Sequence, residues 1–486
     1  MKRLTGRLAI TFLWCMSLHA NTAAAADEVA ARETALADGR ALTAQFLAGE
    51  ADALWPRFGA QLRGVIGSPA GLRGFSTQIR EQLGAEDEVL RETVQRQGEF
   101  TVYQRIGRWS LAPMPIAVTW AFGPDGRVEG FQVAPAPAEA PAADPARAPV
   151  ESGRLPDDAT VAAQLQAFVE QAGAAPGVVV GLHDAQGTRF QAWGDAGDGA
   201  PPDADTVFEA GSITKGLTGL LLAQMVAAGE VELEQPIGDL LPDGLELAPG
   251  LAAITLGELA THRSGLPRLA SGPEMQARMT SDDPYAGSTT VEIFADLARV
   301  MPETVAAGRG RFAYSNLGTA VLGQLLARSV GQPYEDLLAA RVFQALDLPG
   351  PVLDPDAVTG RRAVGTQAGA PVKAWRFDAY APMGAWQASA HELVALGRRL
   401  LQTEPDWVGA ALAPQAVPGH PGTGMGLGWH HAELGARRFV WHNGGTAGCS
   451  SFLAVVPAEG LVVAVLANGG GGIADGLARE LLVSGR

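Results

Sequence analysis

Lysine is almost missing from this sequence of 486 residues, which contains three: Lys2, Lys215 and Lys373. Arginine provides the other strongly basic side chains. Arginine keeps its proton in proteins, whereas a desolvated lysine can lose it. A chain that uses arginine nearly everywhere and still keeps a lysine in an apolar segment therefore makes that lysine, Lys215, a candidate base.

Cysteine is also scarce, with two residues, Cys15 and Cys449. Residues 1–26 are predicted to be a secretory signal peptide: they begin with basic residues, continue with an apolar run too short to span a bilayer, and end in alanines. An ordinary first helix is the alternative. Removal of the peptide leaves Cys449 alone, which excludes an intrachain disulfide. We expect a periplasmic or secreted protein with a core large enough to fold without one.

The lack of long apolar segments and of excess positive charge excludes two kinds of interaction, membrane spanning and nucleic-acid binding. No stretch beyond the N-terminus is apolar and long enough for a membrane helix, so no transmembrane helix is expected. Positive charge is outnumbered, with a formal net charge of −16 at pH 7. Because an acidic surface repels phosphate backbones, nucleic acid is not an expected partner.

An alanine- and proline-rich segment, residues 136–157, is predicted to be a linker between two domains, residues 27–135 and 158–486. The first domain begins with helical patterning. Strand-like alternation follows over 92–104, 116–122 and 128–133, with a turn at Pro124-Asp125-Gly126. This order predicts a small α+β fold, and it resembles NTF2-like domains of the DUF3887 type. We expect an accessory module for binding or dimerisation.

The second domain carries strand patterns at both of its ends. A hairpin is predicted from 178–183 and 189–193, and three strands from 438–442, 451–456 and 461–466. Helices are expected at 161–171 and 473–482, and the long middle part contains capping-box signatures such as Thr255-x-x-Glu258 and Ser389-x-x-Glu392. The pattern predicts an α/β (α+β) fold: an antiparallel sheet built from both chain ends, flanked by helices, with a helical insertion.

Ser212 and Lys215 form a serine-x-x-lysine pattern at the start of a nearly all-apolar helix predicted over 212–228. Residues at i and i+3 share one helix face. Burial and the positive end of the helix dipole both lower the pKa of a lysine, and a shift of about 3 units makes the amine a base near neutrality. Neutral Lys215 can then take the Ser212 proton. The alternative is a serine cap followed by a solvated lysine.

Two further motifs follow along the chain. In Tyr314-Ser315-Asn316, the tyrosine can pass a proton to a leaving group, and Asn316 can hydrogen-bond a substrate amide and Lys215. In the second, a strand that ends in His442 runs into the glycine-rich turn of Gly444 and Gly445, where backbone can approach a substrate closely. The Gly445 and Ser212 amides together can form an oxyanion hole. The alternative for each motif, taken by itself, is an ordinary turn without a functional role.

Together the motifs S-x-x-K, Y-x-N and [KH]-x-G occur in the order and spacing of the class C β-lactamase, DD-peptidase and esterase superfamily, which residues 158–486 resemble. A threonine-histidine segment, Thr261 to Pro267, also resembles this family and is expected to be scaffold. The resemblance implies a β-lactamase/transpeptidase-like fold and no cofactor. It also implies these roles: nucleophile Ser212, base Lys215, proton shuttle Tyr314, and substrate binding by Asn316, His442, Gly444 and Gly445.

The motif around His442 departs from most β-lactamases of this group, which have lysine there to pair with the lactam carboxylate. A histidine is mostly neutral at pH 7 and holds an anion less firmly. We therefore expect a serine hydrolase acting on an amide or ester carbonyl in a small molecule or peptide, with a cell-wall-derived compound among the candidates. The alternatives are a class C-like β-lactamase and a non-catalytic receptor for peptidoglycan or lactam.

Three histidines close in sequence, His420, His430 and His431, raise the question of a metal site. Their spacing matches no metal motif, and no HExxH pattern occurs. A glycine run over 469–472 follows a strand but lacks the lysine of a phosphate-binding loop. The sequence therefore predicts no metal and no nucleotide.

Overall fold

The structure is a computed structural model. It describes residues 32–97, 100–110, 116–135, 153–171, 176–367, 369–434, 437–470 and 472–484. The predicted signal peptide and residues 136–152 of the predicted linker lie outside the described residues. None of the described helices combines the length and the apolar character needed to cross a membrane.

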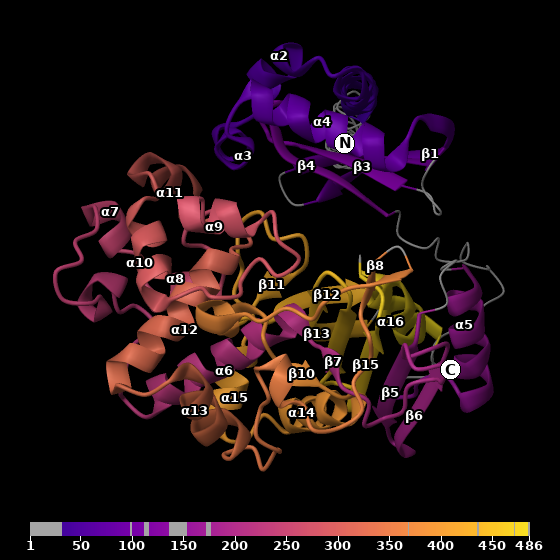
Figure 1. Ribbon diagram of the computed structural model, residues 1–486, viewed down its shortest axis with the longest axis vertical. Helices are drawn as coiled ribbons and strands as arrows, with labels where there is room; N and C mark the ends of the chain where they lie inside the picture. Colours follow the sequence, from indigo (N-terminus) through magenta and orange to yellow (C-terminus); the bar gives the residue numbers. More distant parts are fainter. Residues whose placement is uncertain are drawn as a thin grey trace, which may run out of the picture. The chain divides into compact units, whose positions relative to one another are not determined.

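The chain divides into two compact units, Met1–Ala136 and Pro137–Arg486 (Figure 1). In the first unit, helices precede a four-stranded antiparallel sheet. The helices are a segment over 32–48, α2 (Ala51–Leu54), the 3-10 turn η1 (Trp55–Arg57), α3 (Ala60–Ile66) and α4 (Pro69–Leu83). The strands, in sheet order, are β1 (Glu86–Gln97), β2 (Phe100–Trp109), β3 (Ile116–Phe122) and β4 (Val128–Pro135).

The alternation predicted over 92–104 belongs to two strands, because Gln97 of β1 pairs with Phe100 of β2. Aromatic side chains fill the space between this sheet and its helices. The Trp120 and Phe131 rings stack with centroids 4.0 Å apart, and the buried Trp120 indole donates to Thr43 Oγ1 at 2.8 Å. The first unit thus has a hydrophobic core of its own. The NTF2-like resemblance stays a prediction.

The second unit is built on a seven-stranded antiparallel sheet that joins strands from both ends of the domain (Figure 1). In sheet order the strands are β11 (Gly424–Met425), β12 (His430–Leu434), β13 (Arg437–Gly445), β14 (Ser450–Val456), β15 (Leu461–Ala467), β5 (Val178–Asp184) and β6 (Gly187–Trp193). Short two-residue pairs are β7 (Phe208–Glu209) with β10 (Gln387–Ala388), and β8 (Thr366–Gln367) with β9 (Ala370–Pro371).

The central strands bury both faces, because successive side chains point to opposite sides of a sheet. On β15, Val463 and Val465 join the core beneath α5 (Asp158–Gln171) and α16 (Ile473–Ser484), whereas Val462 and Leu466 join the larger core on the other face. That other core contains α6 (Thr214–Ala227) and α14 (Ala390–Gln402). Figure 1 shows α5 and α16 beside these strands.

Helices make up most of the insertion between the two groups of strands. They are η3 (Ile237–Leu240), α7 (Pro249–Ala252), α8 (Leu256–Ala260), α9 (Pro273–Arg278), α10 (Thr290–Ala298), α11 (Pro302–Gly308), α12 (Asn316–Val330), α13 (Tyr334–Leu338), η4 (Ala339–Phe343), η5 (Pro355–Ala357), η6 (Asp378–Met383) and α15 (Asp406–Leu412). Both predicted capping boxes are present, at α8 and α14, and a third begins α10.

The helix predicted over 212–228 differs at its start. Ser212 lies in a 3-10 turn, η2 (Gly211–Ile213), and the α-helix α6 begins at Thr214. Gly211 has φ +53°, a left-handed conformation that glycine adopts without strain, so the chain turns sharply just before the serine. The serine thus stands on the turn that leads into the buried helix.

Candidate functional site

Ser212 and Lys215 are in direct contact. Lys215 Nζ donates to Ser212 Oγ at 2.9 Å and to the main-chain oxygen of Met383 at 2.6 Å. The Lys215 side chain is buried, while Ser212 is half-buried. Helix α6 packs closely against the segment that contains Trp429, and this packing encloses the amine. Gly216 lies directly against the Trp429 ring, where a side chain would clash. The expected serine–lysine pair is therefore assembled, with the lysine amine shielded from water.

Burial holds the pKa of the Lys215 amine well below its usual value, and the Arg268 guanidinium lowers it further. Within the described part of the chain, no carboxylate lies within ion-pair distance of the amine, so nothing stabilises its charged form by attraction. A desolvated amine without an acidic partner favours the neutral state. In neutral Lys215 the 2.9 Å contact can run the other way, with the Ser212 hydroxyl donating to the lone pair of Nζ, so the amine can accept the Ser212 proton.

Backbone groups come together beside Ser212. A Cβ on Gly211 would lie 2.8 Å from the Gly445 nitrogen, and one on Gly444 would lie 2.0 Å from the carbonyl oxygen of Ala210. Both glycines thus allow the end of β13 to approach the turn that carries the serine. The Gly445 amide is brought next to this turn, which is the juxtaposition that an oxyanion hole with the Ser212 amide requires.

Tyr314 reaches the same pair from the loop before α12. Its hydroxyl is close enough to Ser212 to interact with that side chain, and its ring centroid lies 5.1 Å from Lys215 Nζ. Burial raises the pKa of this phenol to about 12, so it is protonated at neutral pH. A protonated phenol that touches both Ser212 and the surroundings of Lys215 can pass a proton between them and a leaving group.

His262 positions the backbone that carries Tyr314. Its carbonyl accepts from the Ala313 amide at 2.8 Å, and its Nδ1 accepts from the Ser315 amide at 3.2 Å. The two hydrogen bonds flank Tyr314, whose ring lies 4.5 Å from the imidazole. The threonine-histidine segment predicted to be scaffold therefore has a specific task, because His262 holds the tyrosine from both sides.

Asn316 begins α12, with Ser315 as its N-cap. The Asn316 amide donates to the carbonyl of Arg268, but its side-chain Oδ1 is buried and has no hydrogen-bond partner among the described residues. The hydrogen bond to Lys215 that the sequence suggested is not formed, since the amine donates to Ser212 and to Met383 instead. The Asn316 oxygen remains available to a hydrogen-bond donor.

His442 is fully buried on β13, and its Nδ1 lies 2.6 Å from the main-chain oxygen of Asn443. A carbonyl can only accept, so the proton is on Nδ1 and Nε2 is an acceptor. Burial, together with nearby Lys215, lowers the pKa of this imidazole to about 3. His442 is therefore neutral at pH 7, and it presents an acceptor where a lysine would present a cation.

Three of the residues that the sequence placed in or near the site have an unpartnered polar atom. Asn316 Oδ1, His262 Nε2 and His442 Nε2 are all buried and lack a partner within the described part of the chain. Buried polar groups normally find a partner, and unpaired ones are costly. A ligand with hydrogen-bonding groups can satisfy such atoms.

Two of the three histidines that raised the question of a metal, His420 and His430, form a hydrogen-bonded chain, whereas His431 Nε2 lies 2.8 Å from the carbonyl oxygen of Leu412. The Gly422 amide donates to His420 Nδ1, and His420 Nε2 lies 2.8 Å from His430 Nδ1. Because His420 Nδ1 accepts, its proton is on Nε2, which therefore donates to His430. Across the described residues, no cluster of three or more His, Cys, Asp or Glu side chains fits a metal ion.

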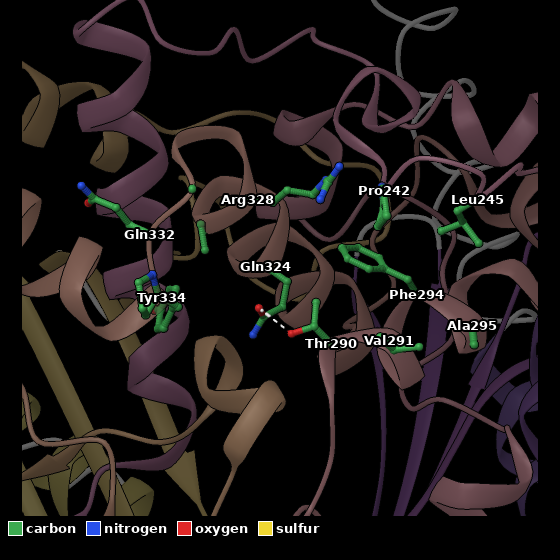
Figure 2. A pocket seen from close by; sticks show the side chains of 13 residues that line it. Pro242, Leu245, Thr290, Val291, Phe294, Ala295, Gln324, Arg328, Gln332 and Tyr334 are labelled. Carbon is green, nitrogen blue, oxygen red and sulfur yellow. Dashed lines mark hydrogen bonds between the residues drawn. The ribbon is translucent and has the colours of Figure 1, made fainter.

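A hollow of about 650 Å³ lies apart from the three motifs (Figure 2). Its lining includes Phe294, Gln324, Arg328 and Tyr334, and Figure 2 shows the hydrogen bond between Gln324 and Thr290. A chain of hydrogen bonds connects the lining of the hollow to the surroundings of Lys215. Tyr334 and Thr218 share a hydrogen bond, and Thr218 donates to the carbonyl of Pro382, the residue before Met383. No residue of the three motifs lines this hollow.

Three contributors to the site had no assigned role in the motifs: the Met383 carbonyl, the Gly211 turn and Arg268. A backbone carbonyl has no residue-type signature, so no motif search finds Met383. Gly211 carried a usable signal, since a glycine directly before a nucleophile indicates a sharp turn. Arg268 follows directly on the Thr261–Pro267 segment but is contiguous with none of the three motifs.

A family model described as Beta-lactamase matches residues 162–484 of the chain. The chain belongs to the β-lactamase family. This confirms the resemblance drawn from the three motifs, and it places the protein among serine hydrolases of that family. The family match lies within the second unit.

Two relatives illustrate the range of the family. Penicillin-binding protein 4 of Amycolatopsis lactamdurans is 30% identical over 299 residues, which are 56% of this chain and 75% of that protein. Esterase EstB of Burkholderia gladioli is 31% identical over 207 residues, or 40% of this chain. The match spans about half of the esterase, 51% of its length.

A solved structure confirms the fold class. A class C β-lactamase from Rhodobacter sphaeroides aligns with a TM-score of 0.56 at 24% sequence identity. The alignment covers 66% of this chain and 98% of that one. The predicted antiparallel sheet with flanking helices and a helical part is therefore correct.

Proposed function

We propose that this protein hydrolyses an amide or ester carbonyl through an acyl-enzyme on Ser212. The observation that carries the proposal is the buried Lys215 amine, 2.9 Å from Ser212 Oγ, with its pKa well below the usual value. A serine hydroxyl is a weak nucleophile until a base accepts its proton. The structure supports a base here that is neutral, desolvated and already hydrogen-bonded to the serine.

In acylation, Ser212 Oγ attacks the substrate carbonyl carbon as its proton passes to Lys215. The negative charge on the carbonyl oxygen is stabilised by the amides of Ser212 and Gly445. Collapse of the tetrahedral intermediate breaks the bond to the leaving group, which receives a proton through Tyr314. Water then attacks the acyl-enzyme, and the reverse proton transfers release the acid and restore Ser212.

We propose that Asn316 and His442 orient the substrate with their unpartnered acceptors, Oδ1 and Nε2. Both atoms accept hydrogen bonds, so they suit a substrate N–H or O–H group. Gly444 allows the backbone of β13 to approach the substrate side of the turn. Removal of either acceptor should therefore weaken binding of substrates that carry such donors.

The substrate class is proposed to be a peptide or ester, with a cell-wall-derived peptide among the candidates. The neutral His442 supports this choice, because it offers no charge to the carboxylate of a lactam. The relatives named as a penicillin-binding protein and as an esterase support a choice between amide and ester substrates. A class C-like β-lactamase is the second candidate, supported by the structural likeness to such an enzyme.

We further propose that residues 1–26 direct the chain to the periplasm or outside the cell, and that residues 27–135 form an accessory domain joined by a linker to a catalytic domain. The catalytic domain is proposed to begin near residue 153, five residues before the predicted start at 158, because Leu155 is buried in its core. The basic, apolar and alanine-rich parts of the N-terminus support the first proposal. Separate cores in the two units support the second.

Covalent labelling tests the nucleophile. A fluorophosphonate should add to Ser212 in the native protein, and mass spectrometry of the peptides should locate the adduct there. Ser212→Ala should abolish labelling and lower kcat by at least about 10⁴-fold. Ser271→Ala, at an exposed serine outside the motifs, is the matched control and should keep both.

Assays on three substrates separate the candidate functions. Parallel assays on nitrocefin, a short p-nitrophenyl ester and a peptide ending in D-alanyl-D-alanine distinguish lactamase, esterase and peptidase activity. A native protein that binds peptidoglycan or penicillin without an adduct on Ser212 and without turnover would be a receptor, which would contradict the proposal.

A further inference from the structure

Arg268 lies at the edge of the site on the loop that follows Pro267. Its guanidinium carbon is 5.0 Å from the centroid of the Tyr314 ring, within the range of a cation–π contact. The side chain is exposed, while its own carbonyl accepts from the Asn316 amide. Arg268 therefore combines a fixed backbone next to Asn316 with a solvent-accessible charge over the phenol that touches Ser212.

The other basic side chains of the site favour their neutral forms. Burial lowers the pKa of each of them: Lys215, His262, His430 and His442. Arginine, in contrast, keeps its proton at any working pH. Arg268 is within electrostatic reach of the centre, since it depresses the pKa of the Lys215 amine. The permanent positive charge at this site is thus provided by Arg268.

This charge has no acidic partner in the part of the protein that the structure describes. Across the described residues, no carboxylate lies within 4.0 Å of the Arg268 guanidinium, whereas Arg309 and Arg376 are paired with acidic side chains. The planar fork of a guanidinium matches a carboxylate with two parallel hydrogen bonds. In an acidic protein, an unpaired arginine at the rim of a reactive serine is suited to an anionic ligand.

The contact with Tyr314 indicates which part of the ligand carries the anion. Under the proposed function, Tyr314 delivers a proton to the leaving group, so the leaving group must lie beside the phenol. The guanidinium carbon of Arg268 lies 5.0 Å from the centroid of the same ring, so this side chain can reach a group carried by a leaving group held there. We infer that Arg268 binds a carboxylate on the leaving group, so that preferred substrates are acyl derivatives of amino acids or hydroxy acids.

This inference rests on the proposed function and also refines it. His442 is a neutral imidazole at pH 7, so it provides no charge for an anionic group of the substrate. Arg268 would provide a cation from a different element, with its guanidinium carbon 5.0 Å from the centroid of the Tyr314 ring. The site would then hold an anionic leaving group without placing a second charge beside the buried Lys215 amine.

Two matched esters test the inference in the full-length protein. The first is the N-acetylglycyl ester of 3-hydroxybenzoic acid, which has an anionic leaving group. The second is the same ester of methyl 3-hydroxybenzoate, which is neutral. Arg268→Gln should lower kcat/KM for the anionic ester at least about tenfold more than it lowers kcat/KM for the neutral ester. Arg268→Lys should recover part of the loss.

An exposed arginine away from the motifs provides the control. Arg328 on α12 has no ion pair within the described part of the chain, and Arg328→Gln should leave both esters unchanged. Raising the ionic strength should increase KM for the anionic ester of the native protein and have little effect on the neutral ester, because salt screens exposed charges.

Three outcomes of the ester assays would overturn the role of Arg268. An equal loss on both esters would mean that Arg268 acts by positioning Tyr314 or shifting Lys215, which overturns the inference. No loss on the anionic ester, or a native protein that turns over the neutral ester alone or neither ester, also overturns it. Absence of turnover together with absence of a fluorophosphonate adduct on Ser212 contradicts the proposed function as well.

Discussion

At the scale of single residues, the site depends on keeping one amine neutral. Lys215 donates to a hydroxyl and a carbonyl and is buried without an acidic partner. An ion pair would stabilise the ammonium form, whereas neutral acceptors leave burial to decide the protonation state. The scarcity of lysine in the sequence and the surroundings of Lys215 in the structure therefore point to the same property, an amine that can lose its proton.

Lys215→Arg should lower kcat by at least about 10³-fold, because arginine keeps its proton and cannot accept that of Ser212. Steady-state turnover of a p-nitrophenyl ester measures the loss. Lys373→Arg, at the exposed lysine that pairs with Asp283, is the matched control and should keep full activity. Normal turnover by Lys215→Arg would refute the assignment of the base.

The same residue shapes the pH profile. Lys215 acts as a base when neutral, so activity should be present above its pKa and lost as pH falls through that value. Because burial places this pKa well below the usual 10.5, the acidic limb of kcat/KM should also lie well below 10.5. His442, with a pKa of about 3, should add no limb between pH 5 and 8.

At the scale of elements, close contacts between backbones set the geometry. A Cβ on Gly219 of α6 would lie 1.8 Å from the carbonyl oxygen of Leu427, so the helix packs directly on that segment. On the opposite face of the sheet, Asn443 Nδ2 of β13 donates to Asp475 Oδ1 at the start of α16, at 2.7 Å. This second contact connects the third motif to the C-terminal helix.

Asp475 should make stability depend on pH. Burial raises the pKa of its carboxyl to about 6 from the ordinary 3.8, and Oδ2 is buried without a partner in the described part of the chain. A carboxyl with a raised folded-state pKa contributes its stabilisation fully below about 3.8 and loses it as pH rises through about 6. The ionised form is therefore disfavoured at neutral pH.

Asp475→Asn should raise the free energy of unfolding by roughly 1–2 kcal/mol at pH 7.5 and leave it unchanged near pH 4, since an amide is neutral at both. Urea unfolding at the two pH values measures the change. Asp406→Asn, at an exposed position in the first turn of α15, is the control and should give no gain at either pH. A loss of stability at pH 7.5 for Asp475→Asn would contradict the assignment.

At the scale of the whole molecule, the two units have separate hydrophobic cores. The second begins close to residue 153, where the Gly153 amide donates to Glu459 Oε2 and the carbonyl of Arg154 accepts from Arg437. The helix that follows, α5, covers Val178 and Val180 on the sheet. These contacts define where a catalytic fragment must start.

A fragment of residues 153–486 should fold and keep kcat/KM on a p-nitrophenyl ester within about threefold of the full chain, because its cores and the site are complete. A shorter fragment, residues 176–486, lacks α5 and should lose stability through exposure of that face. Loss of activity in the longer fragment, with a native circular dichroism spectrum, would show that the first unit takes part in catalysis.

Local patterns in the sequence predicted much of this protein. Alternating apolar residues predicted the strands on both sides of the insertion, because side chains of a strand alternate between faces over a few residues. The capping boxes at Thr255 and Ser389 predicted helix starts for a similarly local reason. The three motifs predicted the family and the members of the site, since each motif is contiguous in the chain.

Tertiary structure alone decided which atoms meet. The carbonyl that holds Lys215 comes from Met383, 168 residues further along the chain. Two further cases are the clamp of His262 on the backbone of Tyr314 and the placement of Arg268 over that ring. A main-chain oxygen looks the same at every residue, and burial depends on the whole fold. For that reason the sequence determined the residue types of the proposed nucleophile and base, and the fold decided the charge state of the lysine and the position of the Arg268 guanidinium.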